Sequence, residues 1–188
     1  MHCWQPFIAI ASKRTMSPSD SLSTSVIRVA ALLGIAVSSY ALYVESRLHE
    51  DNFTAMCDFS ENASCSAVLG SKYGHILSFI GLVPSQHVLD IPNAALGFIF
   101  YIFAFAHTLF PATLLLALST GALAFSAFLA YVLMFILKDF CLICVLSYVL
   151  NTAIFAGSAL NFLKTTAKKE RVESKKRLER GSSGTKKD

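Results

Sequence analysis

Four cysteines form two pairs with different surroundings, and their chemistry is the first question that this sequence raises. Cys57 and Cys65 form a Cys-x7-Cys pair in a polar stretch, whereas Cys141 and Cys144 form a Cys-x-x-Cys pair within the apolar run "KDFCLICVLSYVLN". Pairs of this kind can bind zinc, form static disulfides or exchange electrons as thiols and disulfides. The fifth cysteine, Cys3, lies in an unpatterned N-terminal stretch and is expected to take no part.

The spacing of the pairs favours redox exchange over the other two kinds of chemistry. A structural zinc site usually holds four ligands in a closed knuckle, and the second pair instead lies in an apolar segment. A disulfide across one helical turn closes a short loop and stabilises little, although two static disulfides remain the main alternative. The histidines His75, His87 and His107 are scattered, so no metal site is expected.

A helix that begins at the second pair would order its side chains by depth. Cys141 and Cys144 would share one face, with Cys144 about 4.5 Å further along the axis. The helix N-terminus favours a thiolate at Cys141. Tyr148 lies one turn further on the same face, and Asn93 is expected to cap the preceding apolar segment. An asparagine and a tyrosine across an apolar pocket would hold the two carbonyls of a quinone, which exchanging cysteines could reduce.

Apolar segments of membrane length must position these residues. The chain is 54% hydrophobic and 15% charged, with a mean hydropathy of +0.56, and a soluble domain of this length would be more polar. A helix needs about 20 apolar residues to cross a bilayer. Four segments qualify and predict an all-α membrane protein, a four-transmembrane-helix bundle with a lumenal loop and half-helix as its cap: 26–44, 94–110, 112–137 and 140–163.

Charges flanking these segments predict their orientation. Residues 164–188 hold ten of the 16 Lys and Arg residues, which places this basic tail in the cytosol, and its polar composition predicts disorder. The loop 45–93 has six acidic and two basic residues and is expected on the lumenal side. Four spans in one membrane domain, 26–163, would put both termini, including the N-terminal extension 1–25, in the cytosol. All four paired cysteines would then face the lumen.

Sequons in the loop support a secretory compartment. Asn52 and Asn62 each match the N-glycosylation pattern and are glycosylation candidates. Disulfides also persist in such oxidising compartments. Residues 1–25 do not resemble a signal peptide. In a signal peptide the basic residues precede the apolar stretch, whereas here the basic pair Lys13-Arg14 follows it. We therefore expect a multi-pass protein of the endoplasmic reticulum membrane, with membrane lipid as a partner and no nucleic acid.

These features together resemble the vitamin K epoxide reductase family. The resemblance rests on the four apolar segments, the Cys-x7-Cys loop, "LDIPNAALGFIFY" at 89–101 and "KDFCLICVLSYVLN" at 138–151. It covers about residues 26–163 and fits the epoxide reductases and their reductase-like paralogues equally. It implies a membrane oxidoreductase that reduces vitamin K epoxide to the quinone and then to the hydroquinone, in support of gamma-carboxylation.

The resemblance also implies a role for each paired cysteine. Cys144 would attack the bound quinone or epoxide, and Cys141 would resolve the adduct and receive electrons from Cys65. Cys57 would accept electrons from a thioredoxin-like lumenal oxidoreductase. No cofactor would be permanently bound, since vitamin K is the substrate and a dithiol is the reductant. Coumarin-type inhibitors such as warfarin would occupy the substrate pocket.

The same resemblance implies a set of substrate-binding residues. Asn93 and Tyr148 would hydrogen-bond the substrate carbonyls. Further pocket residues would be Val68, Leu69, Gly74, Phe100, Leu129 and Leu137. One stretch departs from the family pattern Arg-Trp-Gly-Arg-Gly-Phe-Gly, because this chain reads "KYGHILSFIG" at 72–81, with Tyr73 in place of the tryptophan. This departure bears on substrate choice and inhibitor sensitivity more than on the redox chemistry.

Two other functions fit the same residues. A quinone-linked catalyst of disulfide formation in secretory proteins would use the four cysteines with electrons flowing the other way. A non-catalytic four-span membrane protein would need only a structural disulfide between Cys57 and Cys65, and Cys144 would then be dispensable.

Overall fold

The protein is helical throughout the part of the chain that the computed structural model describes, residues 18–48, 50, 53–60, 63–75, 81 and 90–184. The helices are α2 (Pro18–Arg47), α3 (Cys65–Leu69), α5 (Asn93–Phe105), η1 (His107–Leu109, a 3₁₀ turn), α6 (Ala112–Tyr131), η2 (Val132–Leu137, π-helical) and α7 (Leu142–Gly184). Within those ranges the only extended pairing is one isolated bridge between Ser60 and Ala63. The predicted all-α class is confirmed.

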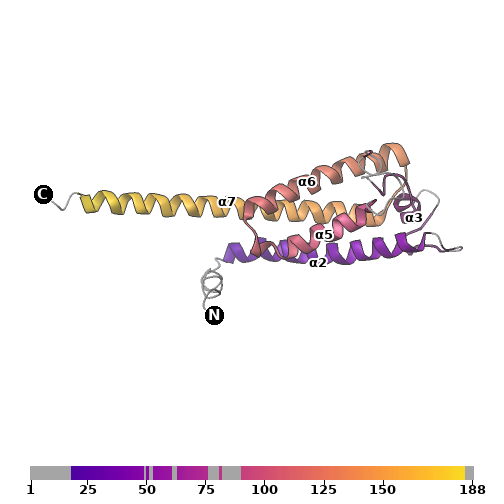
Figure 1. Cartoon of the computed structure of the whole chain (residues 1–188), viewed down its shortest axis with the longest axis horizontal. Helices are drawn as coiled ribbons and strands as arrows, with labels where there is room; N and C mark the ends of the chain where they lie inside the picture. The colour runs from indigo at the N-terminus through magenta and orange to yellow at the C-terminus, as the bar shows by residue number, and fades with distance from the viewer. Residues whose placement is uncertain are drawn as a thin grey trace.

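The long helices lie alongside one another with the loop region at one end (Figure 1). α2 packs against both α5 and α7, and α6 packs against α7. The C-terminal end of α2, the short α3 and the start of α7 meet at the same end of the bundle (Figure 1). The fold therefore brings the loop cysteines and the Cys-x-x-Cys motif to one end, as the sequence predicts.

Two buried clusters hold the bundle together. One lies at the loop end and contains Ala41, Val44, Ala55, Cys57, Cys65, Leu133, Cys141 and Ile143. The other lies further along the bundle and contains Ile27, Ala30, Ala31, Tyr101, Ala104, Leu115 and Ile154. Tyr101 packs closely on Gly34 of α2 and its hydroxyl donates to the backbone oxygen of Ser147 over 3.3 Å. This tyrosine thus fixes α5 between α2 and α7.

Three of the described helices are long and apolar enough to cross a membrane: Leu22–Arg47, Ala112–Leu137 and Leu142–Arg180. α5 has 13 residues, about 20 Å at 1.5 Å per residue, against a hydrocarbon core of about 30 Å. The predicted second span, 94–110, is an unbroken α-helix only to Phe105, because η1 and Pro111 follow and a proline disfavours helix in the residue before it. A fourth crossing remains a prediction.

Helix extends beyond both ends of the predicted membrane domain. α2 begins at Pro18, eight residues before the predicted span and inside the predicted N-terminal extension; proline suits the first turn of a helix because its missing N–H has no partner there. The predicted disorder of the tail is wrong for 164–184, since α7 continues to Gly184 and projects beyond the bundle (Figure 1). Lys, Arg, Glu and Ala favour helix, and Glu173 pairs with Arg177 one turn later.

Candidate active site

The four paired cysteines lie together at the loop end of the bundle. Cys57, Cys65 and Cys141 belong to one buried cluster, and Cys144 packs against it. Cys57 and Cys65 form a disulfide, whereas Cys141 and Cys144 are free thiols whose sulfur atoms are 2.6 Å apart. An oxidised pair therefore lies beside a reduced pair, which is the arrangement that thiol–disulfide exchange requires.

The chain path before α7 places Cys141 at the helix start. η2 ends at Lys138, whose φ of 55° is left-handed and breaks the helix. The backbone oxygen of Cys141 accepts the N–H of Val145 over 3.1 Å, so Cys141 directly precedes the first turn. Its Sγ accepts the backbone N–H of Cys144 over 3.3 Å. Such donors at a helix N-terminus stabilise a thiolate, as the sequence predicts for this cysteine.

Asp58 fixes the loop around the disulfide. Its carboxylate accepts hydrogen bonds from the backbone of Ala55, the hydroxyl of Ser64, and both the backbone and the hydroxyl of Ser66. Ser64 in turn caps α3 by accepting the N–H of Ala67 over 3.2 Å. Burial raises the pKa of Asp58, but the hydrogen bonds from Ser66, Ser64 and Ala55 outweigh it and the pKa is lowered overall. The residues on both sides of Cys65 are therefore held by one carboxylate.

A metal does not suit this corner as it is arranged. Ligand atoms of Cys57, Asp58 and Cys65 lie within 4.8 Å of one another. Zinc requires deprotonated thiolates, and both sulfur atoms are consumed by the disulfide. Both oxygens of Asp58 also already accept hydrogen bonds.

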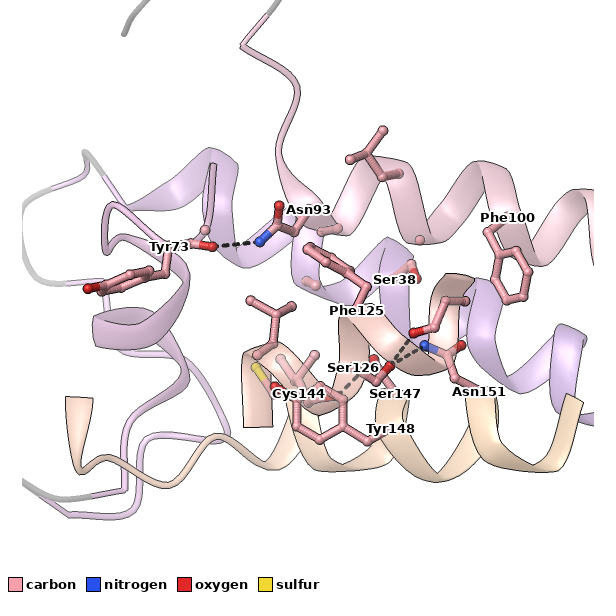
Figure 2. A pocket seen from close by; sticks show the side chains of 18 of the residues that line it. Ser38, Tyr73, Asn93, Phe100, Phe125, Ser126, Cys144, Ser147, Tyr148 and Asn151 are labelled. Atoms are coloured by element: carbon pink, nitrogen blue, oxygen red, sulfur yellow. Dashed lines mark hydrogen bonds between the residues drawn. The ribbon is translucent and has the colours of Figure 1, made fainter. Parts of the chain in front are cut away.

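A largely apolar cavity of about 640 Å³ lies directly beside the reduced pair (Figure 2). This volume is typical of small-molecule sites. Residues from α5, α6, α7 and the α3 region all contribute to its wall. Every residue that the resemblance implies for substrate binding lines it, together with the inner cysteine: Val68, Leu69, Gly74, Asn93, Phe100, Leu129, Leu137, Cys144 and Tyr148. The structure brings these residues together, and their roles remain predictions.

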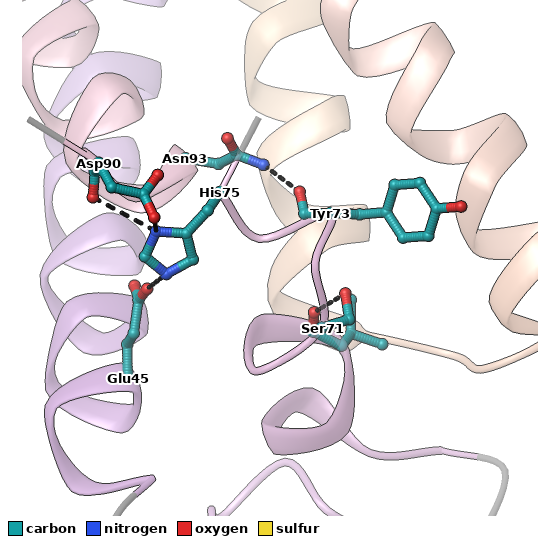
Figure 3. A network of polar contacts seen from close by, with 7 residues as sticks. Glu45, Ser71, Tyr73, His75, Asp90 and Asn93 are labelled. Carbon is teal, nitrogen blue, oxygen red and sulfur yellow. Dashed lines mark hydrogen bonds and ion pairs between the residues drawn. The ribbon is translucent and has the colours of Figure 1, made fainter. Parts of the chain in front are cut away.

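Asn93 is held by the loop rather than acting as a helix cap. Pro92 occupies the capping position and Asn93 is the first residue of α5, so the predicted cap is wrong. The side-chain nitrogen of Asn93 donates to the backbone oxygen of Tyr73 over 2.6 Å (Figures 2 and 3). Its backbone N–H donates to Gly74 over 2.8 Å. The orientation of this amide at the cavity wall is therefore set by the loop segment that departs from the family pattern.

The cavity also has polar residues that the sequence analysis did not identify. Asn151 donates to the hydroxyl of Ser126 over 2.8 Å, and its Oδ1 is buried without a hydrogen-bond partner among the described residues. Its helical spacing of three residues from Tyr148 and seven from Cys144 could have identified it. Ser38 and Ser126 come from α2 and α6, so only the tertiary structure reveals them.

Several sequence predictions fall outside the described residues. These are the roles of Cys3, His87 and the glycosylation candidates Asn52 and Asn62, and most of the apolar stretch after His75. His107 is buried at the start of η1, with its Nδ1 2.9 Å from the backbone oxygen of Ala104. It lies outside the cavity wall.

Comparison with known proteins supplies an independent result. The sequence profile of the vitamin K epoxide reductase family matches residues 25–159. The chain is 32% identical over 139 residues to vitamin K epoxide reductase complex subunit 1 of Mus musculus, covering 70% of this chain and 86% of the mouse protein. It is 30% identical over 129 residues to the Rattus norvegicus protein of the same name, covering 65% of this chain and 80% of the rat protein. The matched region contains the four paired cysteines and the whole wall of the cavity.

Proposed function

The chain belongs to the vitamin K epoxide reductase family, and from that premise we propose that it reduces vitamin K epoxide to the quinone and the quinone to the hydroquinone. The observation that carries this proposal is the placement of Cys144 in the wall of an apolar cavity, within 2.6 Å of the second thiol of its pair. Asn93 and Tyr148 lie in the same wall and can donate hydrogen bonds to the two carbonyl oxygens of a quinone.

The proposed reaction balances on these two thiols. Cys144 attacks the bound substrate as a thiolate, and Cys141 then attacks its sulfur, which forms the Cys141–Cys144 disulfide and expels the reduced substrate. One epoxide and two thiols give one quinone, one water and one disulfide. One quinone and two thiols give one hydroquinone and one disulfide.

A second exchange must then return the helix pair to its reduced state. We infer that Cys65 attacks the Cys141–Cys144 disulfide at Cys141 once the loop pair is reduced. The joint burial of Cys65 and Cys141 in one cluster supports this step. Cys57, which is 6% exposed, would receive electrons from a thioredoxin-like lumenal oxidoreductase.

The side of the membrane on which this chemistry takes place is inferred from the charged residues that flank the apolar segments. We propose that α5 together with residues 106–111 completes a fourth crossing, so that both termini lie in the cytosol and the cysteines face the lumen of the endoplasmic reticulum. Figure 1 supports this topology, since α2 begins and α7 ends toward the end of the bundle opposite α3. Coumarin-type inhibitors would compete for the same cavity, because it is the apolar space next to Cys144.

Turnover by the full chain in microsomes tests the proposal. With dithiothreitol as reductant, the chain is expected to reduce both vitamin K epoxide and the quinone. Cys144→Ser should abolish both activities, and Cys3→Ser is the matched control that should retain them. Cys57→Ser should stay active with dithiothreitol, because a small dithiol reaches the helix pair directly, and should lose activity with a protein donor.

The same experiment separates the other candidates. The neighbouring disulfide and dithiol also suit a quinone-linked catalyst of disulfide formation, because exchange is reversible. Quinone reduction without epoxide reduction would favour that function. No reduction of either substrate by correctly inserted protein would favour a non-catalytic membrane protein in which only the loop disulfide matters.

A further inference from the structure

His75 joins three separate segments of the chain beside the cavity (Figure 3). Its Nε2 lies 2.9 Å from Oε1 of Glu45, near the end of α2. Its Nδ1 lies 3.3 Å from Oδ2 of Asp90, just ahead of α5, and also 3.3 Å from the backbone oxygen of the same residue. The side chains of Glu45 and Asp90 are only 15% and 10% exposed.

The contacts place the ring of His75 between two carboxylates. Both ring nitrogens face carboxylate oxygens, and an imidazole nitrogen that carries a proton can donate to such an oxygen. Glu45 from α2 and Asp90 from the segment before α5 are the charged groups that the described structure places against the ring. On its own segment, Lys72 instead lies over the ring of Tyr73, 5.2 Å from its centre.

The segment that His75 anchors also orients Asn93. The backbone oxygens of Tyr73 and Gly74 accept hydrogen bonds from the side chain and the backbone of Asn93, over 2.6 Å and 2.8 Å. Tyr73, Gly74 and Asn93 all line the cavity. The three residues 73–75 thus hold the start of α5 through Asn93 and Asp90, and hold α2 through Glu45.

Resting on the proposed function, we propose that His75 is a positioning residue whose contacts with Glu45 and Asp90 set the Asn93 amide for the substrate. These contacts draw residues 73–75 against α2 and the start of α5, and this fixes the carbonyl groups that hold Asn93. Without them the segment loosens and substrate affinity falls. The family pattern has arginine at this position, which can also donate to two carboxylates.

Kinetics of the full chain in microsomes test this role. With saturating dithiothreitol and vitamin K epoxide as substrate, His75→Gln is expected to raise KM about tenfold, the equivalent of one charge-assisted hydrogen bond, and to leave kcat largely unchanged. His75→Arg should restore a low KM, because an arginine can donate to both carboxylates.

Two comparisons make the test specific. Glu50→Gln breaks an exposed ion pair with Arg47 near the same end of the bundle and should behave like the parent. Glu45→Gln should raise KM in the parent and add little in His75→Gln, because both changes remove the same contact. An unchanged KM in His75→Gln, a loss confined to kcat, or a His75→Arg that fails to restore KM would overturn the inference.

Amide hydrogen exchange gives a readout that is independent of turnover. Peptides that cover residues 72–75 and 91–96 should exchange faster in His75→Gln than in the parent, whereas a peptide within 150–160 of α7 should not change. Unchanged exchange in the first two peptides would overturn the role of His75 even in an active enzyme. A parent that reduces neither epoxide nor quinone would instead overturn the proposed function, and the exchange result would still decide whether His75 holds the Asn93 segment.

Discussion

Individual polar residues decide how the sulfur atoms face one another. Asp58 accepts hydrogen bonds from three residues that surround the loop disulfide, and Cys141 is held by the first turn of α7. The Cys-x-x-Cys pair could be predicted from the sequence because its spacing fixes a shared helical face. The hydrogen bonds of Asp58 could not, because they depend on how the loop folds between Ala55 and Ser66. The contact of Asn151 with Ser126 could not either, because it joins two helices.

The first prediction concerns the charge of Asp58. In the fold, hydrogen bonds hold the pKa of Asp58 below the ordinary aspartate value of 3.8. The ionised carboxylate therefore stabilises the fold above that value, and this stabilisation is lost as pH falls through the folded pKa. The loop disulfide should therefore become easier to reduce with tris(2-carboxyethyl)phosphine as pH falls below about 4. The rate of release of the Cys57 and Cys65 thiols measures this change.

At neutral pH, the loop disulfide of Asp58→Asn should be reduced as readily as that of the parent in acid. The substitution removes the charge that three donor residues share, at a cost of about 1–3 kcal/mol to the folded loop. Glu179→Gln, on the exposed part of α7, is the matched control. Equal reduction rates for the parent and Asp58→Asn at pH 7 would contradict this account of the loop.

The helices show which features of the sequence are sufficient to predict where a helix lies and which are not. The spans within α2, α6 and α7 could be predicted because long apolar runs have few alternatives to a membrane helix. The length of α5 could not, because hydropathy continues through 106–110 while the backbone leaves the α-helix after Phe105. The helical tail was also missed, because a charged composition suits both a disordered chain and an exposed helix.

The second prediction concerns the contact between α2 and α5. A Cβ added at Gly34 would overlap the ring of Tyr101, and overpacking of this kind costs about 1–3 kcal/mol. Gly34→Ala should therefore lower the midpoint of thermal unfolding in detergent. Gly121→Ala is the matched control on α6, since its added Cβ has no neighbour within 4 Å and alanine favours helix. A Gly34→Ala protein as stable as the Gly121→Ala protein would refute the close packing.

At the scale of the whole molecule, the account depends on which side of the membrane each end of the bundle faces. The cysteines and the cavity lie at the end where α3 is found, and the basic part of α7 projects from the opposite end (Figure 1). The basic residues of that projection favour the cytosol. The cysteines would then be in the lumen, where thioredoxin-like donors are available.

The third prediction is the protease sensitivity of intact microsomes. Trypsin added outside should cleave after the lysines and arginines of 168–180, because these residues are exposed on the part of α7 that projects beyond the bundle. Arg47 and Lys72 should be protected until detergent is added. Protection of the tail, or cleavage at Lys72 before detergent, would reverse the proposed orientation.

The most direct test of the central claim is a single turnover of the fully reduced chain. Protein that carries both Cys57→Ser and Cys65→Ser has no loop thiol to attack the new disulfide. In detergent it would be reduced with a dithiol, freed of it, mixed with excess vitamin K epoxide and quenched with acid. The account predicts one quinone formed for each Cys141–Cys144 disulfide that appears in mass-spectrometric peptide maps, and neither product in Cys144→Ser. Quinone formed without that disulfide, or the disulfide formed without quinone, would contradict the claim that this pair of thiols reduces the epoxide.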